Sequence, residues 1–202
     1  RGKLSAVDEI DLSLIEIIGS QSGLSTKMVQ VGIDGTDPIG APLTSVDSNY
    51  GSTVTYGFAM KDSGYQTDRD VWNALNSEPD TVVVASIVVP SRSGFDEFAD
   101  ADLFQLTGFY RDDTDLPETY IDVFDRTLQT STRLRVIGVL DESASPEFVG
   151  LFITGEESLA QLQPMPPLQF SRRLYDPTNS VDIARALEAA FVTNGMQAQA
   201  LS

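Results

Sequence analysis

Hydrophobic residues recur at helical spacing near both ends of the chain, and strand-like patterns accompany them. Residues 4–18 are predicted to form an amphipathic helix with an apolar face of Val7, Ile10, Leu14, Ile17 and Ile18. A second helix is predicted from Ser180, an N-cap residue, to the Asn194-Gly195 stop, with an apolar face of Val181, Ala184, Leu187, Ala190 and Phe191. Strands are expected at Lys27–Ile33, Gln169–Tyr175 and Met196–Leu201.

The middle of the chain alternates short apolar runs with turn residues, which predicts a β-rich region. Tyr120–Phe124 and Leu134–Leu140 are expected to pair as a hairpin, joined by polar residues 125–133. The β-branched run Thr81–Val89 predicts a buried strand. A further strand is expected at Phe148–Ile153, and the capping pattern Thr154-Gly155-Glu156-Glu157 predicts a short helix after it.

Residues 34–67 are rich in Gly, Pro, Ser, Thr and Asp, and we expect mostly turns there, with a short strand at Ser52–Phe58. The next segment is predicted to be a short helix that begins at Asp68 and is ended by Pro79 and Asp80. Its inner face is predicted to consist of Val71, Trp72 and Leu75. This shared face favours a structural role for the tryptophan.

These elements together predict an α+β fold. Strand–helix–strand elements from both termini are expected to form one membrane-proximal lobe, made of residues 1–36 and 165–202. Residues 37–164 are expected to form a β-rich second lobe inserted in the first. Chain ends that lie close together suit a domain held between two membrane anchors. An α/β arrangement of the same pattern is the main alternative.

The composition removes most catalytic chemistry. The chain has no cysteine and no histidine, which excludes disulfides and thiolate chemistry and removes the usual general base near neutral pH. We find no glycine-rich phosphate loop and no nucleophile elbow. No apolar run reaches the ~20 residues that cross a bilayer. We therefore expect no enzymatic activity, no catalytic residues and no cofactor.

The charge balance is strongly acidic, with 30 acidic against 13 basic residues and a formal net charge of −17. A polyanion of this kind is repelled by phosphate backbones, so we expect no nucleic-acid partner. Residues 96–125 hold ten acids and one base, Arg111. A solvated, self-repelling surface is the simpler interpretation of this stretch.

A cation site is the sharper interpretation of the same acids. Hard oxygen ligands for calcium occur at short spacing in Asp112, Asp113 and Asp115, and also in Asp96, Asp100 and Asp102. Neither run fits the twelve-residue EF-hand loop. Carboxylate pairs for glycoside hydrolysis would come from Asp112, Asp113 and Asp115, or from Asp68 with Asp70. Close pairs also arise by chance among so many acids.

Three segments resemble the extracytoplasmic domains of FtsX-like (MacB-type) ABC-transporter permeases. The first is FQLTGFY at residues 104–110, and the second is LRVIGVLD at 134–141, continued by FIT at 152–154. The third is ARALEAAF at 184–191, followed by NGMQA at 194–198. The resemblance covers residues 68–202, and the order and spacing of the segments carry it.

The resemblance implies an extracytoplasmic, non-catalytic domain of a bacterial plasma-membrane permease. In that family a cytoplasmic subunit hydrolyses ATP, and the permease passes the energy across the membrane as motion. The implied partners are this ATP-binding subunit, a second permease subunit, and an extracytoplasmic substrate or partner protein. The parent gene is expected to continue into an apolar helix after Ser202 and to begin with one before Arg1.

Two other functions compete with this interpretation. A secreted solute- or carbohydrate-binding module would use a groove formed by Trp72 or by the aromatic residues of 95–110, although aromatic residues at such spacing are more often part of the core. A carboxylate hydrolase would use the acidic pairs named above.

Overall fold

The computed structural model describes residues 18–33, 37–92, 104–142, 144, 150–160, 169–174, 178 and 180–193. The chain divides into two compact units. One unit is Ser22–Ser171, and the other combines Arg1–Gln21 with Arg172–Ser202. The chain contains helices and a mixed β-sheet, as predicted. The proposed lobes 1–36 with 165–202, and 37–164, stay a prediction.

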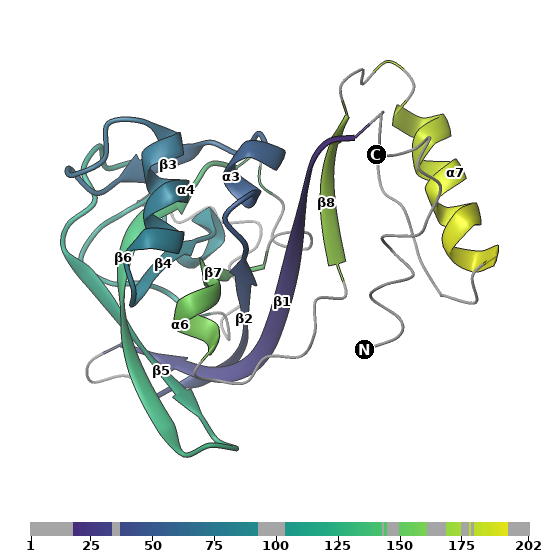
Figure 1. Cartoon of the computed structure of the whole chain (residues 1–202). Helices are drawn as coiled ribbons and strands as arrows, with labels where there is room; N and C mark the ends of the chain where they lie inside the picture. Colours follow the sequence, from purple (N-terminus) through teal and green to yellow (C-terminus); the bar gives the residue numbers. More distant parts are fainter. Residues whose placement is uncertain are drawn as a thin grey trace. The chain divides into compact units, whose positions relative to one another are not determined.

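The described elements follow one another in the order shown by the colours of Figure 1. The strands are β1 (Ile18–Gly32), β2 (Ile39–Val46), β3 (Phe58–Lys61), β4 (Thr81–Val84), β5 (Thr119–Asp125), β6 (Thr130–Leu140), β7 (Phe152–Gly155) and β8 (Gln169–Leu174). The helices are α3 (Tyr50–Thr53), α4 (Asp68–Ser77), the 3-10 turn η1 (Ser86–Val88), α6 (Glu156–Ala160) and α7 (Ser180–Thr193).

Six strands pair in a closed ring. They are hydrogen-bonded in the order β2-β7-β4-β6-β5-β1, and β1 pairs with β2 again to close the ring. The pairs β2–β7 and β4–β6 are parallel, and the other pairs of the ring are antiparallel. Outside the ring, β3 pairs with the last residues of β6, and β8 is next to β1.

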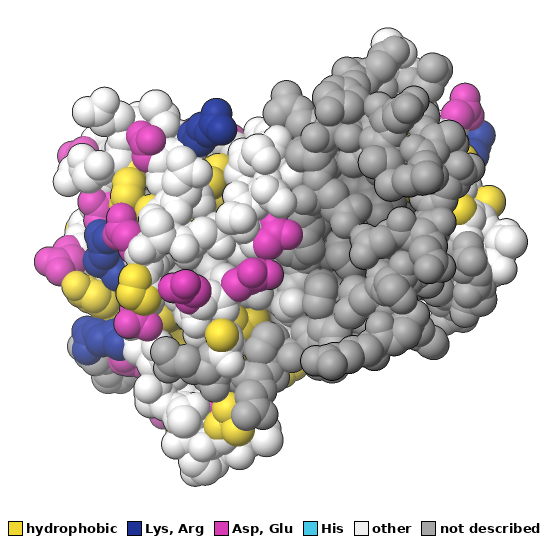
Figure 2. Space-filling model, viewed as in Figure 1, with side chains coloured by type: hydrophobic (Ala, Val, Ile, Leu, Met, Phe, Trp, Pro, Cys, Tyr) yellow, Lys and Arg dark blue, Asp and Glu magenta, His cyan; other side chains and the backbone are white. Residues whose placement is uncertain are grey.

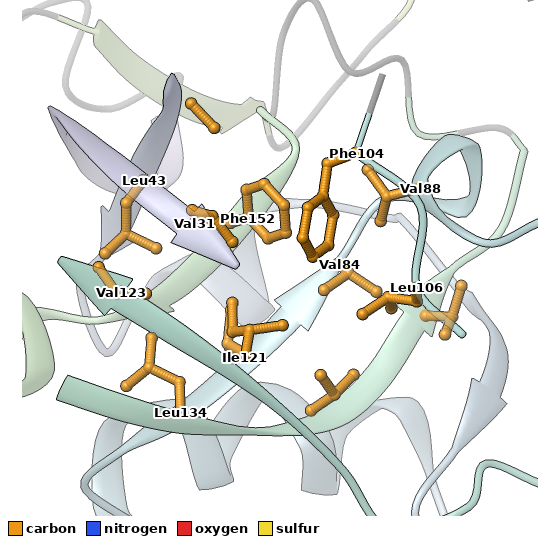
Figure 3. Packing of buried hydrophobic residues seen from close by; sticks show 14 of the residues in the cluster. Val31, Leu43, Val84, Val88, Phe104, Leu106, Ile121, Val123, Leu134 and Phe152 are labelled. Atoms are coloured by element: carbon orange, nitrogen blue, oxygen red, sulfur yellow. The ribbon is translucent and has the colours of Figure 1, made fainter. Parts of the chain in front are cut away.

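The strands bury side chains on both faces, because successive residues of a strand point to opposite sides. In β4, Val82 and Val84 belong to one cluster, which we call the inner core, and Val83 belongs to a second cluster, the outer core. Figure 3 shows side chains of the inner core pointing toward one another from several strands of the ring, among them Val31, Leu43, Val84, Ile121, Val123 and Phe152.

The outer core lies under α3 and α4. The capping box of α4 fixes its start: Asp70 N donates to Thr67 Oγ1 at 3.2 Å, and Thr67 N donates to Asp70 Oδ2 at 2.7 Å. Trp72 is 4% exposed, and its ring lies 5.2 Å from that of Tyr50 and 4.9 Å from that of Phe58. The predicted helix and the structural role of its tryptophan are therefore confirmed.

Local hydrogen bonds explain why the predicted strand Ser52–Phe58 is wrong. Ser52 lies in α3, and only Phe58 belongs to a strand, β3. Asp47 Oδ1 accepts from Asn49 N at 2.9 Å, and the hydroxyls of Ser52 and Thr53 donate to Asn49 O. Such short-range side-chain bonds compete with a sheet ladder and favour a turn.

Strand β2 was not predicted, because Gly40 and Pro42 indicated turns. Proline has no backbone N–H to donate. Pro42 is tolerated because the pairing of β2 with β7 begins only at Leu43, so Pro42 has no hydrogen bond to donate to β7. On its other side Pro42 lies opposite Met28 of β1.

Several predicted boundaries also change. The hairpin is confirmed as β5 and β6, but its strands extend to Asp125 and Thr130 and leave a shorter connection. The run Thr81–Val89 is a strand only to Val84, and η1 follows. Of the predicted Phe148–Ile153 strand, only Phe152 and Ile153 belong to β7, which continues to Gly155, and residues 148–149 lie outside the described residues. The short helix is observed as α6, but Thr154 and Gly155, predicted to open it, are the last residues of the strand.

At the chain ends, the described residues test only part of the prediction. The second helix is confirmed as α7, although Val181, predicted on its apolar face, is exposed. The predicted strand Gln169–Tyr175 is observed as β8 from Gln169 to Leu174, and Tyr175 lies outside the described residues. Ile18, predicted as the last helical residue, instead begins β1, and the place of this strand in the sheet outweighs the local helical pattern. The rest of the 4–18 helix and the strand 196–201 lie outside the described residues.

One glycine allows α4 to pack against β7. A Cβ atom added at Gly155 would lie 1.8 Å from the carbonyl oxygen of Leu75, a contact that backbone atoms cannot relieve by rotation. Gly155→Ala is expected to lower the free energy of unfolding by about 3 kcal/mol or more, measured by urea denaturation.

The matched control is Gly40→Ala in β2, where the added Cβ would meet only Gln30 Nε2, at 3.6 Å. We expect this variant to unfold within about 0.5 kcal/mol of the parent. Equal stability of Gly155→Ala and the parent would contradict the assigned packing of α4.

Candidate functional site: an exposed face at the β5–β6 hairpin

The predicted calcium candidates lie in a turn with other partners. Asp113 Oδ2 accepts from Tyr110 N at 2.9 Å, and its Oδ1 lies 2.5 Å from Arg92 Nη2. Asp112 and Asp115 are exposed. Among the residues that the structure describes, no three acidic side chains gather where a metal could be held. Calcium binding there stays a prediction without geometric support, and Asp96, Asp100 and Asp102 lie outside the described residues.

The pair Asp68 and Asp70 is occupied by local structure. Asp68 Oδ1 accepts from Lys61 Nζ at 2.6 Å. Asp70 belongs to the capping box, and the hydrogen bond from the Thr67 backbone lowers the pKa of its carboxyl below the ordinary value. A general acid needs the opposite shift. The geometry therefore gives no support to glycoside hydrolysis at this pair.

The aromatic residues expected to line a groove are mostly buried in the core. Phe104 and Phe109 belong to the inner core, and the Phe104 ring lies 5.5 Å from that of Phe152. Tyr110 is exposed, with the Arg92 guanidinium 4.9 Å from the centre of its ring. Within the described part of 95–110, most aromatic side chains thus fill the fold rather than face a ligand.

One face of the sheet does expose aromatic, apolar and basic side chains together. In β5, Ile121 and Val123 are buried, while Tyr120, Asp122 and Phe124 alternate with them, point the other way and are half-buried. We call this surface the hairpin face, and it consists of Met28, Gln30, Tyr120, Asp122, Phe124, Arg126 and Arg133.

Cross-strand neighbours hold the hairpin face together. Phe124 lies opposite Gln30 of β1, and Gln30 Oε1 accepts from Arg126 Nη2 at 3.0 Å. The Arg133 guanidinium lies 4.9 Å from the centre of the Tyr120 ring. Met28 in β1 is 66% exposed. In Figure 1 the hairpin extends past the helices at the bottom of the view, away from the helix-covered side of the sheet.

Asp125 fixes the turn that carries this face. Its side chain is 1% exposed, and Lys27 Nζ lies 2.5 Å from Oδ2. Oδ1 accepts from the backbone N–H groups of Thr127 and Leu128 at 2.8 and 3.3 Å. The pKa of Asp125 is lowered, first by the hydrogen bond from Lys27 and then by these N–H groups, against the opposing effect of burial. The ionised carboxylate is therefore the form that the fold stabilises.

Arg135, two residues beyond Arg133, serves the fold itself. It pairs with Asp62, and its Nη2 lies 3.1 Å from Glu78 Oε2 and 3.2 Å from the hydroxyl of Tyr65. This network joins β6 to the turn after β3 and to the end of α4.

Aromatic residues, methionine and arginine are the residue types enriched in protein interfaces, whereas catalysis needs groups that can exchange protons or attack substrate. The hairpin face therefore has the residue types of a surface that recognises a partner. The sequence signal that could have found it was the alternation in β5 of Tyr120, Asp122 and Phe124 with buried residues.

The comparison with solved structures finds the same fold in an extracellular transporter domain. The extracellular domain of the ABC-type transporter YknZ from Gram-positive bacteria superposes with a TM-score of 0.52 and 13% identity, over 98% of this chain and 88% of that one. The periplasmic region of MacB from Actinobacillus actinomycetemcomitans gives a TM-score of 0.48 and 14% identity, over 96% of this chain and 75% of that one.

No protein-family model and no curated protein matches the sequence. None of the helices in the described part of the chain is long and apolar enough to span a membrane. The structural likeness thus establishes the fold, and the sequence resemblance found independently in residues 68–202 points to the same class of domain.

Asp125→Asn is expected to lower the free energy of unfolding by about 1–3 kcal/mol at about pH 7. The reason is that Lys27 then faces a neutral amide in place of its carboxylate partner. The pKa of Asp125 is lower in the folded chain than in the unfolded chain, where it has its ordinary value. The carboxylate therefore stabilises the fold fully at pH values above the ordinary pKa, and this stabilisation is lost as the pH falls through the lowered, folded-state pKa. Urea denaturation at about pH 7 and about pH 3 should show the difference from the parent shrinking in acid.

The exposed Asp115→Asn is the control and should differ from the parent by less than about 0.5 kcal/mol at both pH values. A difference for Asp125→Asn that stayed constant across this range would refute the role given to the ionised carboxylate.

Proposed function

We propose that this chain is the extracytoplasmic, non-catalytic domain of an FtsX-like (MacB-type) ABC-transporter permease in a bacterial plasma membrane. The observation that carries the proposal is the fold shared with the YknZ extracellular domain over 98% of the chain. The sequence segments at 104–110, 134–141 and 184–198 support it independently, because their resemblance to the family lies in the residues themselves.

The division of the chain supports a position between two membrane anchors. Arg1–Gln21 and Arg172–Ser202 belong to one unit, and chain segments that share a unit suit a domain held between two membrane anchors. In the proposal, the predicted lobe of residues 1–36 and 165–202 is the membrane-proximal one, and residues 37–164 are the β-rich lobe inserted in it.

The proposed role is to pass on motion that a cytoplasmic ATP-binding subunit drives. The chain crosses from one unit to the other inside β1, after Gln21, and inside β8, after Ser171, and these two strands are neighbours in the sheet. Hydrogen-bonded strands hold their length better than flexible linkers do. A second permease subunit and an extracytoplasmic substrate or protein complete the proposed assembly, and the hairpin face is the proposed contact surface for that protein.

A secreted solute- or carbohydrate-binding module was the alternative. It depended on a groove lined by Trp72 or by the aromatic residues of 95–110. Trp72, Phe104 and Phe109 are buried in the cores, so no observation in the described residues favours that function over the permease domain.

Location is tested by cysteine labelling in the full-length protein in intact cells. The chain has no cysteine, so Ser131→Cys at an exposed position of β6 introduces one reactive thiol into it. A membrane-impermeant maleimide is expected to label Ser131→Cys without permeabilisation. Ser45→Cys, at a position 2% exposed, is the matched control and should stay unlabelled until the protein is denatured. Labelling of Ser131→Cys only after permeabilisation would place the domain in the cytoplasm and end the proposal.

Transmission is tested by lengthening both strands that connect the units. Two glycines inserted after Gln21 and after Ser171 should uncouple the units, because glycine weakens a strand. In the reconstituted transporter, a fluorophore on Ser131→Cys is expected to report an ATP-dependent change that these insertions reduce at least about fivefold, while ATP hydrolysis continues.

The same insertion after Asp112, in an exposed turn, is the control and should leave the ATP-dependent change intact. An unchanged signal with both strands lengthened would mean that motion does not pass along β1 and β8.

A further inference from the structure

Helix α7 exposes two valines, one near each of its ends. Val181 and Val192 are 49% and 59% exposed, and they are two of the four large hydrophobic side chains exposed in the described residues. Figure 2 shows hydrophobic side chains over α7 at the right of the view, beside acidic and basic ones. The opposite side of the helix is also apolar and half-buried, with Ile183, Leu187 and Ala190.

Four residues form a regular stripe along the helix, of which Val181, Arg185 and Val192 are exposed and Glu188 is half-buried. From Val181 the stripe passes to Arg185, then to Glu188 and then to Val192, in steps of four, three and four residues. These steps keep the side chains on one side of a helix with 3.6 residues per turn, as in the contact seam of paired helices. We call these four residues the α7 stripe.

The α7 stripe is complementary to itself when the second helix runs in the opposite direction. Val181 and Val192 are equally far from the midpoint between Ala186 and Leu187, and so are Arg185 and Glu188. In an antiparallel pair, each valine would therefore face the other valine of the second helix, and each arginine would face a glutamate. In a parallel pair, like charges would face each other.

We propose that the α7 stripe is a homotypic docking surface, on which α7 of a second copy of this chain packs antiparallel. Two copies related by a two-fold axis use the same surface on both sides, as this self-complementarity requires. Arg185 also contacts Asp182 of its own helix at 3.8 Å, with both side chains largely exposed, so this weak pair does not compete strongly.

The pairing is weak in the free chain. A helix of 14 residues is about 21 Å long, and one such pair buries less than the ~1,200 Å² of a stable interface. The net charge of the chain, −17, also opposes the association of two copies. Anchoring two copies in one membrane would raise their local concentration enough to favour the pairing, and that step alone rests on the proposed function.

Cross-linking of the isolated 202-residue chain tests the pairing directly. Val181→Cys and Val192→Cys are prepared separately, in a chain that has no other cysteine, and are treated at high concentration with a short bis-maleimide. Antiparallel pairing predicts that the mixture of the two variants gives at least about fivefold more cross-linked dimer than either variant alone. Equal cross-linking of Val181→Cys alone would indicate parallel or random association and overturn the proposal.

The matched control is Ala186→Cys, exposed on the same helix but off the α7 stripe. Its mixture with Val181→Cys should give no more dimer than the single variants. The proposal would also be overturned if the mixture of Val181→Cys and Val192→Cys gave no more cross-linked dimer than this control mixture. Circular dichroism confirms that each variant is folded, since all three positions are exposed.

Charge exchange provides the second measurement. Arg185→Glu and Glu188→Arg, each added to both cysteine variants, should lower cross-linking at least about threefold, because like charges then face each other. The double exchange should restore cross-linking to within about twofold of its level without the exchanges. Added salt should weaken the effects of the two single exchanges and of the double exchange. Failure of the double exchange to restore cross-linking would refute the opposed charge pairs. Because no membrane or ATPase is present, these results do not depend on the labelling result for the permease role.

Discussion

The closed ring of strands depends on β1. This strand pairs with β2 over eight positions and with β5 over three, so it joins the two ends of the order β2-β7-β4-β6-β5. Its inward residues Val29 and Val31 complete the inner core. The next inward position, Lys27, pairs with Asp125 of β5. The apolar interior thus ends in one ion pair, and the same carboxylate shapes the turn of the exposed hairpin.

Local pattern predicted the elements whose stabilisation is local. The capping box of α4 and the alternation of β5 are visible in the sequence, and α7 has a strong start and stop. Strand β2 was missed because the tolerance of Pro42 depends on which neighbour pairs on which side. Helix α3 was missed although its hydrogen bonds are local, because the alternation of Val54, Tyr56 and Phe58 indicated a strand and the bonds of Ser52 and Thr53 to Asn49 O favour a turn. Closure of the ring was not predictable either, because it joins residues far apart in the chain.

The candidate site was predictable to a smaller extent. The acidic residues proposed as ligands or catalysts were chosen by spacing, and the structure uses Asp68, Asp70 and Asp113 for an ion pair, a helix cap and a turn. The hairpin face combines residues of β1, β5 and β6, so only the observed pairing reveals it. Met28 in particular reads as part of an apolar strand until the register shows it on the outer side.

The two-sided pairing of β1 has a mechanical consequence. A force that reaches β1 from the chain end runs along the strand, parallel to its axis, while its hydrogen bonds to β2 and β5 lie across that axis. Such loading shears many bonds simultaneously and cannot open them one after another like a zipper. A force along β1 would therefore displace the whole sheet before the hydrogen bonds of the ladder break.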